Sequence, residues 1–527
     1  MERRHGPVVR EAQRDGGIEI LLKLTPVSWG LAALAAAILV GYVVPEGEYA
    51  PLMFMALVFA GSGGLWAFPF SERRERRRLI SLFLLAFAVR VGSAVLFDSL
   101  GAAAGDPYAG SPDAWSYDLW ARKLVLAWSE LRDLNLHAYN QAGRWDVGFH
   151  YILAVFYAVF GESILAGRLL VAFLGALATV FLYLVARRVA GDSVAAIAGL
   201  LYAFWISSIA WSGYSLLRDS LVWALTLLAI WLVLRVVDGS ALAGLGLFLG
   251  LVLLRTIRPY AAVFVVAGIG VAGVLALLLR SRGALRPALI LAAAVLTCEA
   301  VFFTTGFPSV IQMAGVYRPS QVLLKPMKEG PPLKIRGYPA TAPQPVLDGE
   351  LPRPRVSPHL FGPSLPANTL RFFLSPPGWA PLPGGIPRFH NWQLPGMWPW
   401  YAILPVAVLG LFLSARGRPS LRSITITAVI FCLMLILVGR GDFVRQREMV
   451  VPVFLLWFAI GLQPALRRPR GLIAVYLIYA AIFGAGIAYH RSTLRARGMV
   501  RLEMPRDGRP PTLPCFRAYA LLVSPPS

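Results

Sequence analysis

The chain has 527 residues, of which 57% are hydrophobic and 15% are charged, with a mean hydropathy of +0.64. Soluble proteins carry about 25% charged residues, so this composition excludes an ordinary soluble enzyme, a disulfide-stabilised scaffold and a disordered protein. The net charge of +23 comes from basic residues in short groups between apolar runs, as at 73–78. This pattern is typical of cytoplasmic loops in a polytopic membrane protein and argues against nucleic acid as a partner.

Apolar runs long enough to cross a hydrocarbon core of about 30 Å predict an all-α protein with about thirteen transmembrane helices. They cover residues 27–44, 51–70, 79–97, 165–186, 192–210, 219–236, 241–257, 260–280, 287–306, 398–415, 421–439, 449–463 and 471–489. The run 148–160 is too short to span, so we expect a helix lying along or dipping into the outer face. With a cytoplasmic N-terminus, the basic groups then fall inside and the C-terminal tail outside.

The order of these runs predicts five segments. They are an N-terminal cytoplasmic segment with two extra spans at 1–78, a core at 79–306 whose first outer loop is 98–164, a Pro-rich irregular outer loop at 307–397, C-terminal spans at 398–489 and a polar tail at 490–527.

The first outer loop combines carboxylates with aromatic side chains. Within it, the stretch from Ser116 to Leu131 is amphipathic, and we expect it to form a juxtamembrane helix in the headgroup layer.

Charged residues at the membrane need a reason, because one at mid-span costs about 2.5–3.5 kcal/mol. Arg90 lies deep in a span. The other such residues gather at outer helix ends, and they are Arg218, Asp219, Arg255, Arg258, Arg445 and Arg447. Guanidinium groups on one face are suited to bind a phosphate. The alternative is local neutralisation, Arg218 by Asp219 and Arg445 by Asp442 or Glu448.

Three stretches resemble glycosyltransferases of the C-type (GT-C) superfamily that use polyprenyl-phosphate sugars, in the branch of protein O-mannosyltransferases and aminoarabinose transferases. They are AVRVGSAVLFD with SPDAWSYDLWARKL, the run from VFGESILAGRLL to LLRDSLVWALTLLAIWLVLR, and PPGWAP with GRGDFVRQREMVVP. The resemblance covers 79–240 well and 371–462 loosely. The chain departs from the mannosyltransferases at 144–148, which reads RWDVG, and at Ala114, where the family has a second acid.

The resemblance implies a GT-C-like fold and an inverting transfer of sugar from a polyprenyl phosphate to an acceptor hydroxyl. Asp113 would be the general base, with Asp118 and Asp146 as alternatives, and Arg255, Arg258, Arg445 or Arg447 would hold the phosphate. Trp115 and Tyr117 would either shape the sugar and acceptor sites or anchor the loop.

The implied setting is the inner or plasma membrane, with the active site on the outer side. The partners would be the lipid-linked donor, membrane lipids and an acceptor that the sequence does not identify. No cofactor is implied, and the question of a divalent metal stays open. Two alternatives are a polysaccharide polymerase or ligase that uses a lipid-pyrophosphate donor, and a glycolipid transporter without chemistry. A transporter would favour charges deep in the spans and internal repeats, whereas only Arg90 is deep.

Overall fold

The computed structural model describes residues 50–67, 73–103, 108, 112–130, 147–214, 216–278, 285–304, 389–417, 419–438, 448–471, 473–474 and 476–481. The predicted span 27–44, most of the loop 307–397, the tail 490–527 and the site candidates Asp146, Arg445 and Arg447 lie outside these residues. By their contacts, residues Met1–Leu462 and Gln463–Ser527 form two compact units. The helix contacts and the candidate site described below lie in the first unit.

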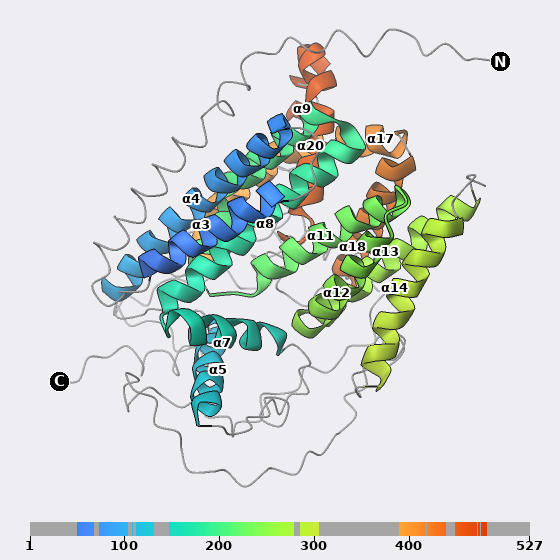
Figure 1. Cartoon of the computed structure of the whole chain (residues 1–527). Helices are drawn as coiled ribbons and strands as arrows, with labels where there is room; N and C mark the ends of the chain where they lie inside the picture. The colour runs from blue at the N-terminus through green and yellow to red at the C-terminus, as the bar shows by residue number, and fades with distance from the viewer. Residues whose placement is uncertain are drawn as a thin grey trace, which may run out of the picture. The chain divides into compact units, whose positions relative to one another are not determined.

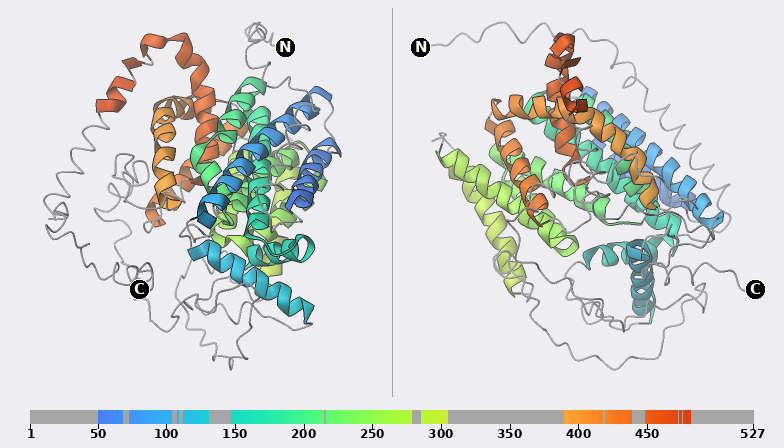
Figure 2. Two further views of the ribbon diagram at one scale, coloured as in Figure 1. Left: turned by 90° about the vertical axis from the view of Figure 1, so that its left-hand side faces the viewer. Right: turned by 180° about the vertical axis from the view of Figure 1, so that it is seen from behind.

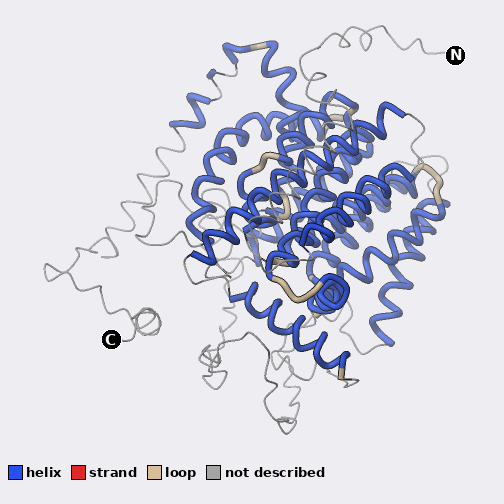
Figure 3. The backbone as a smooth tube through the Cα atoms, turned by 60° about the vertical axis from the view of Figure 1, so that its left-hand side comes forward, coloured by secondary structure: helices blue, strands red, loops and turns tan. Residues whose placement is uncertain are grey.

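The described residues form helices joined by turns, without a strand among them, which confirms the all-helical prediction (Figure 3). The N-terminal helices are α3 (Ala50–Ala67), α4 (Arg73–Ala103), α5 (Pro112–Ser129), α7 (Gly148–Phe160), α8 (Ile164–Ala190), α9 (Asp192–Ala203), α10 (Ile206–Ile209) and the π-helix η1 (Ala210–Tyr214). The later helices are α11 (Asp219–Val237), α12 (Ala241–Ile257), α13 (Pro259–Leu278), α14 (Leu285–Thr304), α17 (Phe389–Ala415), α18 (Pro419–Val438) and α20 (Val451–Arg467).

Helix α8 is central to the packing. Ser163 caps its first turn by accepting a hydrogen bond from the Ala166 amide at 3.4 Å, and Gly191, with φ of 93°, ends it. Positive φ at Gly191 costs little because glycine has no Cβ. Helix α8 packs against α4, α9 and α11, and α3, α4 and α8 run side by side (Figure 1). The α4–α8 contact includes an edge-to-face pair between Phe83 and Phe173 with centroids 5.7 Å apart.

Three described helices are long and apolar enough to cross a membrane: Arg73–Ser99, Ile164–Ala190 and Asp219–Val237. A fourth span results if the bent pair α9 and α10–η1 is counted as one. The described part of the chain thus supports a membrane protein with three or four candidate spans and does not confirm thirteen. Further described helices, α12 and α20 among them, are apolar but shorter, at 17 residues each.

The predicted continuous span 192–210 is wrong in one respect, because the helix breaks. Helix α9 ends at Ala203, Trp205 is extended with φ of −68° and ψ of 108°, and the chain resumes as α10 at an angle of 53°. A break inside a membrane leaves helix-end carbonyl groups that need donors from the protein. Arg90 of α4 supplies them, as described below.

Helix α7 occupies residues 148–160, where the sequence predicts a short helix that does not cross the bilayer. Its 13 residues extend about 20 Å at 1.5 Å per residue, which is less than the hydrocarbon thickness. It runs across the beginning of α8 (Figure 1), from which the turn at Gly161 separates it, and α5 packs against it (Figure 2). The predicted amphipathic helix 116–131 begins earlier, at Pro112, and ends at Ser129.

Candidate active site

The start of α5 presents the predicted general base. Proline lacks a backbone N–H and has a helical φ, so Pro112 suits the first helical position, and Asp113 in the first turn is favoured by the helix dipole. The side chains of Asp113 and Trp115 are half-buried, whereas Tyr117 and Asp118 are buried. Asp113 and Tyr117 are four residues apart and therefore lie on the same face of α5.

Tyr117 joins α5 to two other helices. Its ring meets Phe149 and His150 of α7 edge-on, with both centroid distances 5.1 Å. The guanidinium carbon of Arg218, the residue that precedes α11, lies 5.5 Å from the centroid of the same ring. Arg218, at the start of α11, therefore lies over a ring that is one helical turn from Asp113 along α5.

Asp118 is fully buried and accepts three hydrogen bonds. The Tyr157 hydroxyl donates to Oδ1 at 2.6 Å, and the Tyr108 hydroxyl and Arg122 Nε donate to Oδ2 at 2.7 and 2.8 Å. Arg122 also faces Glu162, with Nη1 and Oε2 3.7 Å apart. These contacts link α5 to α7 and to the turn before α8.

Burial and charge shift the pKa values in this group. Burial, and after it the Asp118 carboxylate, raises the pKa of Tyr157 well above its usual value, so the hydroxyl remains a donor. Burial lowers the pKa of Arg122, but the charge of Asp118 and its hydrogen bond outweigh this and raise it. Burial raises the pKa of Glu162, and Arg122 offsets part of that rise.

The junction between α12 and α13 positions the next guanidinium groups. A residue before proline disfavours helical geometry, and Arg258, before Pro259, has φ of −151° and ψ of 83°. Arg258 Nη2 lies 3.3 Å from Oδ1 of Asp219, and both side chains are buried. Asp219, the predicted partner of Arg218, thus forms an ion pair with Arg258.

Arg255 is also paired. Its guanidinium donates to Glu299 of α14, a residue that sequence reasoning passed over. Glu299 is an acid within an apolar run, and the rule that buried charges need partners could have identified it. A third pair joins Arg168 of α8 to Asp98 of α4. The arginines at these helix ends are thus balanced by carboxylates from other helices.

Arg90, the charged residue deep in a predicted span and a candidate for substrate binding, donates hydrogen bonds to the broken helix. Its Nη2 donates to the Tyr202 carbonyl at 3.2 Å and to Ser208 Oγ at 3.1 Å, and its Nη1 donates to the Ala203 carbonyl at 3.3 Å. The side chain is fully buried. On the other side of the break, Ser207 donates to the buried Glu448, which follows the predicted Arg445 and Arg447 and stands three residues before α20.

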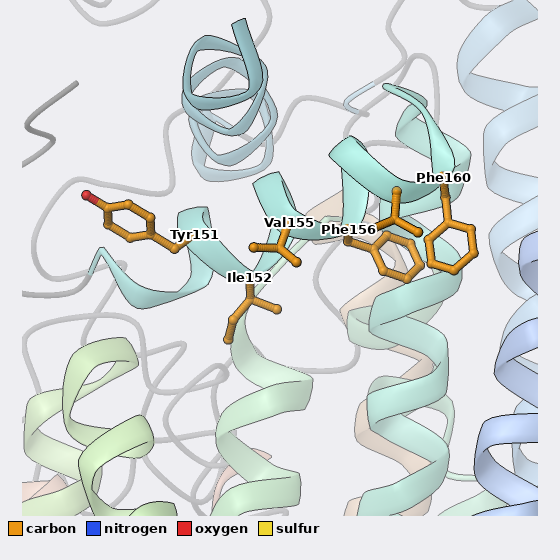
Figure 4. A pocket seen from close by; sticks show the side chains of 6 residues that line it. Tyr151, Ile152, Val155, Phe156 and Phe160 are labelled. Carbon is orange, nitrogen blue, oxygen red and sulfur yellow. The ribbon is translucent and has the colours of Figure 1, made fainter. Parts of the chain in front are cut away.

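An apolar groove lies along the face of α7 opposite the residues that contact Tyr117. It has a volume of about 410 Å³ and is lined by Tyr151, Ile152, Val155, Phe156, Val159 and Phe160 (Figure 4). The side chains that line it are almost entirely apolar, so the groove does not contain the candidate catalytic groups. It lies on α7, the helix that also contacts Tyr117. Among the described residues, no group of three or more His, Cys, Asp or Glu side chains could hold a metal ion.

The fold and these residues define an all-helical membrane protein with a carboxylate and guanidinium groups gathered at one end of its helices. Residues 147–307 match the family model described as dolichyl-phosphate-mannose-protein mannosyltransferase. The match confirms the resemblance over this segment and supports a membrane glycosyltransferase of the GT-C type. It covers α7 to α14, with the paired arginines, but begins after α5 and Asp113. No curated protein sequence gives a significant match.

Proposed function

We propose that this protein transfers a sugar from a polyprenyl phosphate to an acceptor hydroxyl at the outer face of the membrane. The observation that carries the proposal is the position of Arg218 over Tyr117, one helical turn from Asp113 on the same face of α5. A carboxylate that can accept a proton and a guanidinium that can bind a phosphate therefore lie at one junction of helices.

In the proposed reaction, Asp113 accepts the proton of the acceptor hydroxyl as its oxygen attacks the anomeric carbon. The bond from that carbon to the phosphate oxygen breaks, and polyprenyl phosphate leaves with the electron pair, which inverts the anomeric centre. The leaving phosphate is already ionised, so a general acid is not required. Arg218 stabilises the charge that develops on it. The lipid chain lies against the apolar groove of α7.

The paired state of Arg255 and Arg258 bears on which arginine binds the donor. A phosphate that approached either side chain would compete with Glu299 or Asp219. Arg218 stands at the start of α11, where the helix dipole adds to its attraction for an anion. Because Arg218 lies at this helix start and over the ring of Tyr117, we assign the donor phosphate to Arg218, and to Arg255 and Arg258 the holding of the helix ends around it.

The test uses detergent-purified protein and a panel of labelled polyprenyl-phosphate sugars. The wild type should consume one of them and release free polyprenyl phosphate, a product that a pure transporter does not form. Asp113→Asn should lower the rate by about 10²- to 10⁴-fold, the contribution typical of a general base, while donor binding is retained. Glu130→Gln, at the exposed far end of α5, is the matched control and should keep the wild-type rate.

Two results would overturn the proposal. One is full activity in Asp113→Asn, which would remove the base. The other is release of a pyrophosphate-linked lipid product from a lipid-pyrophosphate donor with no turnover of the monophosphate donors, which would favour a polymerase or ligase.

A further inference from the structure

Helix α5 packs along α7, and specific side-chain contacts connect the two helices at two separate places. Tyr117 contacts the beginning of α7, at Phe149 and His150. Asp118, the next residue, bonds to Tyr157 near the end of α7. Two contacts spaced along α7 define both the position and the direction of α5 on that helix.

The bonding of Asp118 is that of an anchor and not of a base. Its carboxylate is fully buried, and both oxygens accept short hydrogen bonds, from Tyr157 on one side and from Tyr108 and Arg122 on the other. An acceptor hydroxyl would have to displace one of these donors to reach it. The charge is balanced by Arg122, which an adjacent carboxylate, Glu162, holds in place. Hydrogen bonds to a charged acceptor are stronger than neutral ones, which suits this role.

The anchor connects α5 to the rigid part of the fold. Tyr157 lies one turn before Gly161, and α8 starts three residues after that glycine. The first turns of α8 are held to α4 by the ion pair between Arg168 and Asp98. Through Asp118, the start of α5 is therefore fixed with respect to the helices that carry Arg218.

We propose that Asp118 is a positioning residue that fixes α5, and with it Asp113, at the working distance from Arg218 by binding Tyr108, Arg122 and Tyr157. The proposal rests on the proposed function for the role of Asp113. A displacement of about 1 Å of a reacting group costs about 100-fold in rate. Asp118→Asn, which replaces a charged acceptor with an amide that is itself a donor, should lower kcat by about 10- to 100-fold with little change in KM.

The experiment pairs kinetics with a distance measurement. Spin labels are attached at Ser129 of α5 and Ala158 of α7, both exposed positions, and the distance distribution between them is measured by pulsed electron paramagnetic resonance. In the wild type and in Asp113→Asn the distribution should be narrow. In Asp118→Asn it should broaden, and Tyr157→Phe, which removes one of the three donors, should broaden it less and lower kcat by a few-fold.

Asp113 as a general base and Asp118 as a positioning residue predict different combinations of activity and distance distribution. Asp113→Asn should lose activity with a narrow distribution, whereas Asp118→Asn should lose activity with a broad one and keep the pH–rate profile of the wild type. A narrow distribution in both Asp118→Asn and Tyr157→Phe, or an unchanged kcat with a broad one, would overturn the positioning role. If the wild type consumes none of the donors, the proposed function fails, while broadening in Asp118→Asn still supports the attachment of α5 by this residue.

Discussion

At the scale of single residues, arginines that the sequence marks as unusual are explained by pairing across helices. Arg168, Arg255 and Arg258 each contact a carboxylate from a different helix, and all three side chains are buried. Taking charges out of water is costly, so such pairs add little net stability, but removing one partner leaves the other charge uncompensated. Their role is to fix which helix ends meet.

The pair between Arg255 and Glu299 provides a test of this role. Arg255→Leu should lower the free energy of unfolding by about 1–3 kcal/mol, because it removes the guanidinium partner of the partly buried Glu299. The double variant Arg255→Leu with Glu299→Leu should recover most of that loss. Both are measured by thermal or denaturant unfolding in detergent. A double variant as unstable as the single one would contradict the pairing, and so would a stable Arg255→Leu.

Glu162 makes stability depend on pH. Burial raises its pKa in the folded protein, and Arg122 offsets only part of the rise. A raised carboxyl pKa means that the folded state holds the proton more tightly. The stabilisation by protonated Glu162 is therefore present below the pKa of the unfolded chain, about 4.3, and it is lost as the pH rises through the pKa of the folded protein. The Tm difference between wild type and Glu162→Gln should therefore shift against the wild type as the pH rises above the unfolded pKa of about 4.3. A difference that stays constant or moves in favour of the wild type would contradict the assignment.

At the scale of elements, the positions of the described helices follow the hydropathy pattern, but the break between α9 and α10 does not. The run 192–210 is apolar throughout, and an average of hydropathy over a window contains no information on backbone direction. A sequence signal for the break is present in another helix, because Arg90 lies deep in its span. A charge at that depth needs acceptors, and free helix-end carbonyls are among the few that a membrane interior offers.

Replacing Arg90 tests this explanation of the break. Arg90→Met removes the guanidinium donor from the Ala203 carbonyl and one of the donors from the Tyr202 carbonyl, which also accepts from the Trp205 amide at 3.3 Å. We expect a loss of about 1–3 kcal/mol of unfolding free energy, mainly for the Ala203 carbonyl left unsatisfied. Ser208→Ala removes only one acceptor of the same guanidinium and should cost about 1 kcal/mol. Unfolding in detergent measures both, and equal stabilities of the two variants would show that the carbonyl contacts do not matter.

At the scale of the whole molecule, the helices have a basic end that carries its own ion pairs. Arg187 pairs with Glu75 and Asp192, Arg78 pairs with Asp192 and Arg188 pairs with Asp238, which joins the ends of α4, α8, α9 and α11. The excess of arginine at this end favours a cytoplasmic location. The candidate site, with α5 and α7, lies at the other end of α8 and is thereby expected on the outer side.

Cysteine labelling tests this orientation. In a background with Cys298, Cys432 and Cys515 replaced by alanine, a membrane-impermeant maleimide should label Ser129→Cys in intact cells. Ala241→Cys, exposed just after the basic end of α11, should react only after the membrane is permeabilised. The reverse pattern would place the candidate site in the cytoplasm.

The candidate site was only partly predictable from the sequence. Asp113, Tyr117 and Arg218 could be selected because the composition of the first outer loop and the charges at helix ends are visible in the sequence. Which carboxylate each arginine contacts depends on helix packing, so the partnership of Arg258 with Asp219, and the anchoring of Asp118 by Tyr157, could not be derived. Tyr157 is one aromatic residue in an apolar run, and nothing in that pattern distinguishes it.

The hydrogen bonds from Arg90 to the broken helix have a consequence for biosynthesis. Of its acceptors, the Tyr202 and Ala203 carbonyls follow it by 112 and 113 residues. At about 5–20 residues per second, the ribosome needs roughly 6 to 22 s to make them. Throughout that interval the Ala86 carbonyl in α4 itself is present, but the acceptors of the guanidinium in the broken helix do not yet exist. The insertion of this early helix is therefore completed only by a segment translated much later, and a chain stalled before residue 202 has no means of burying that charge in its native form.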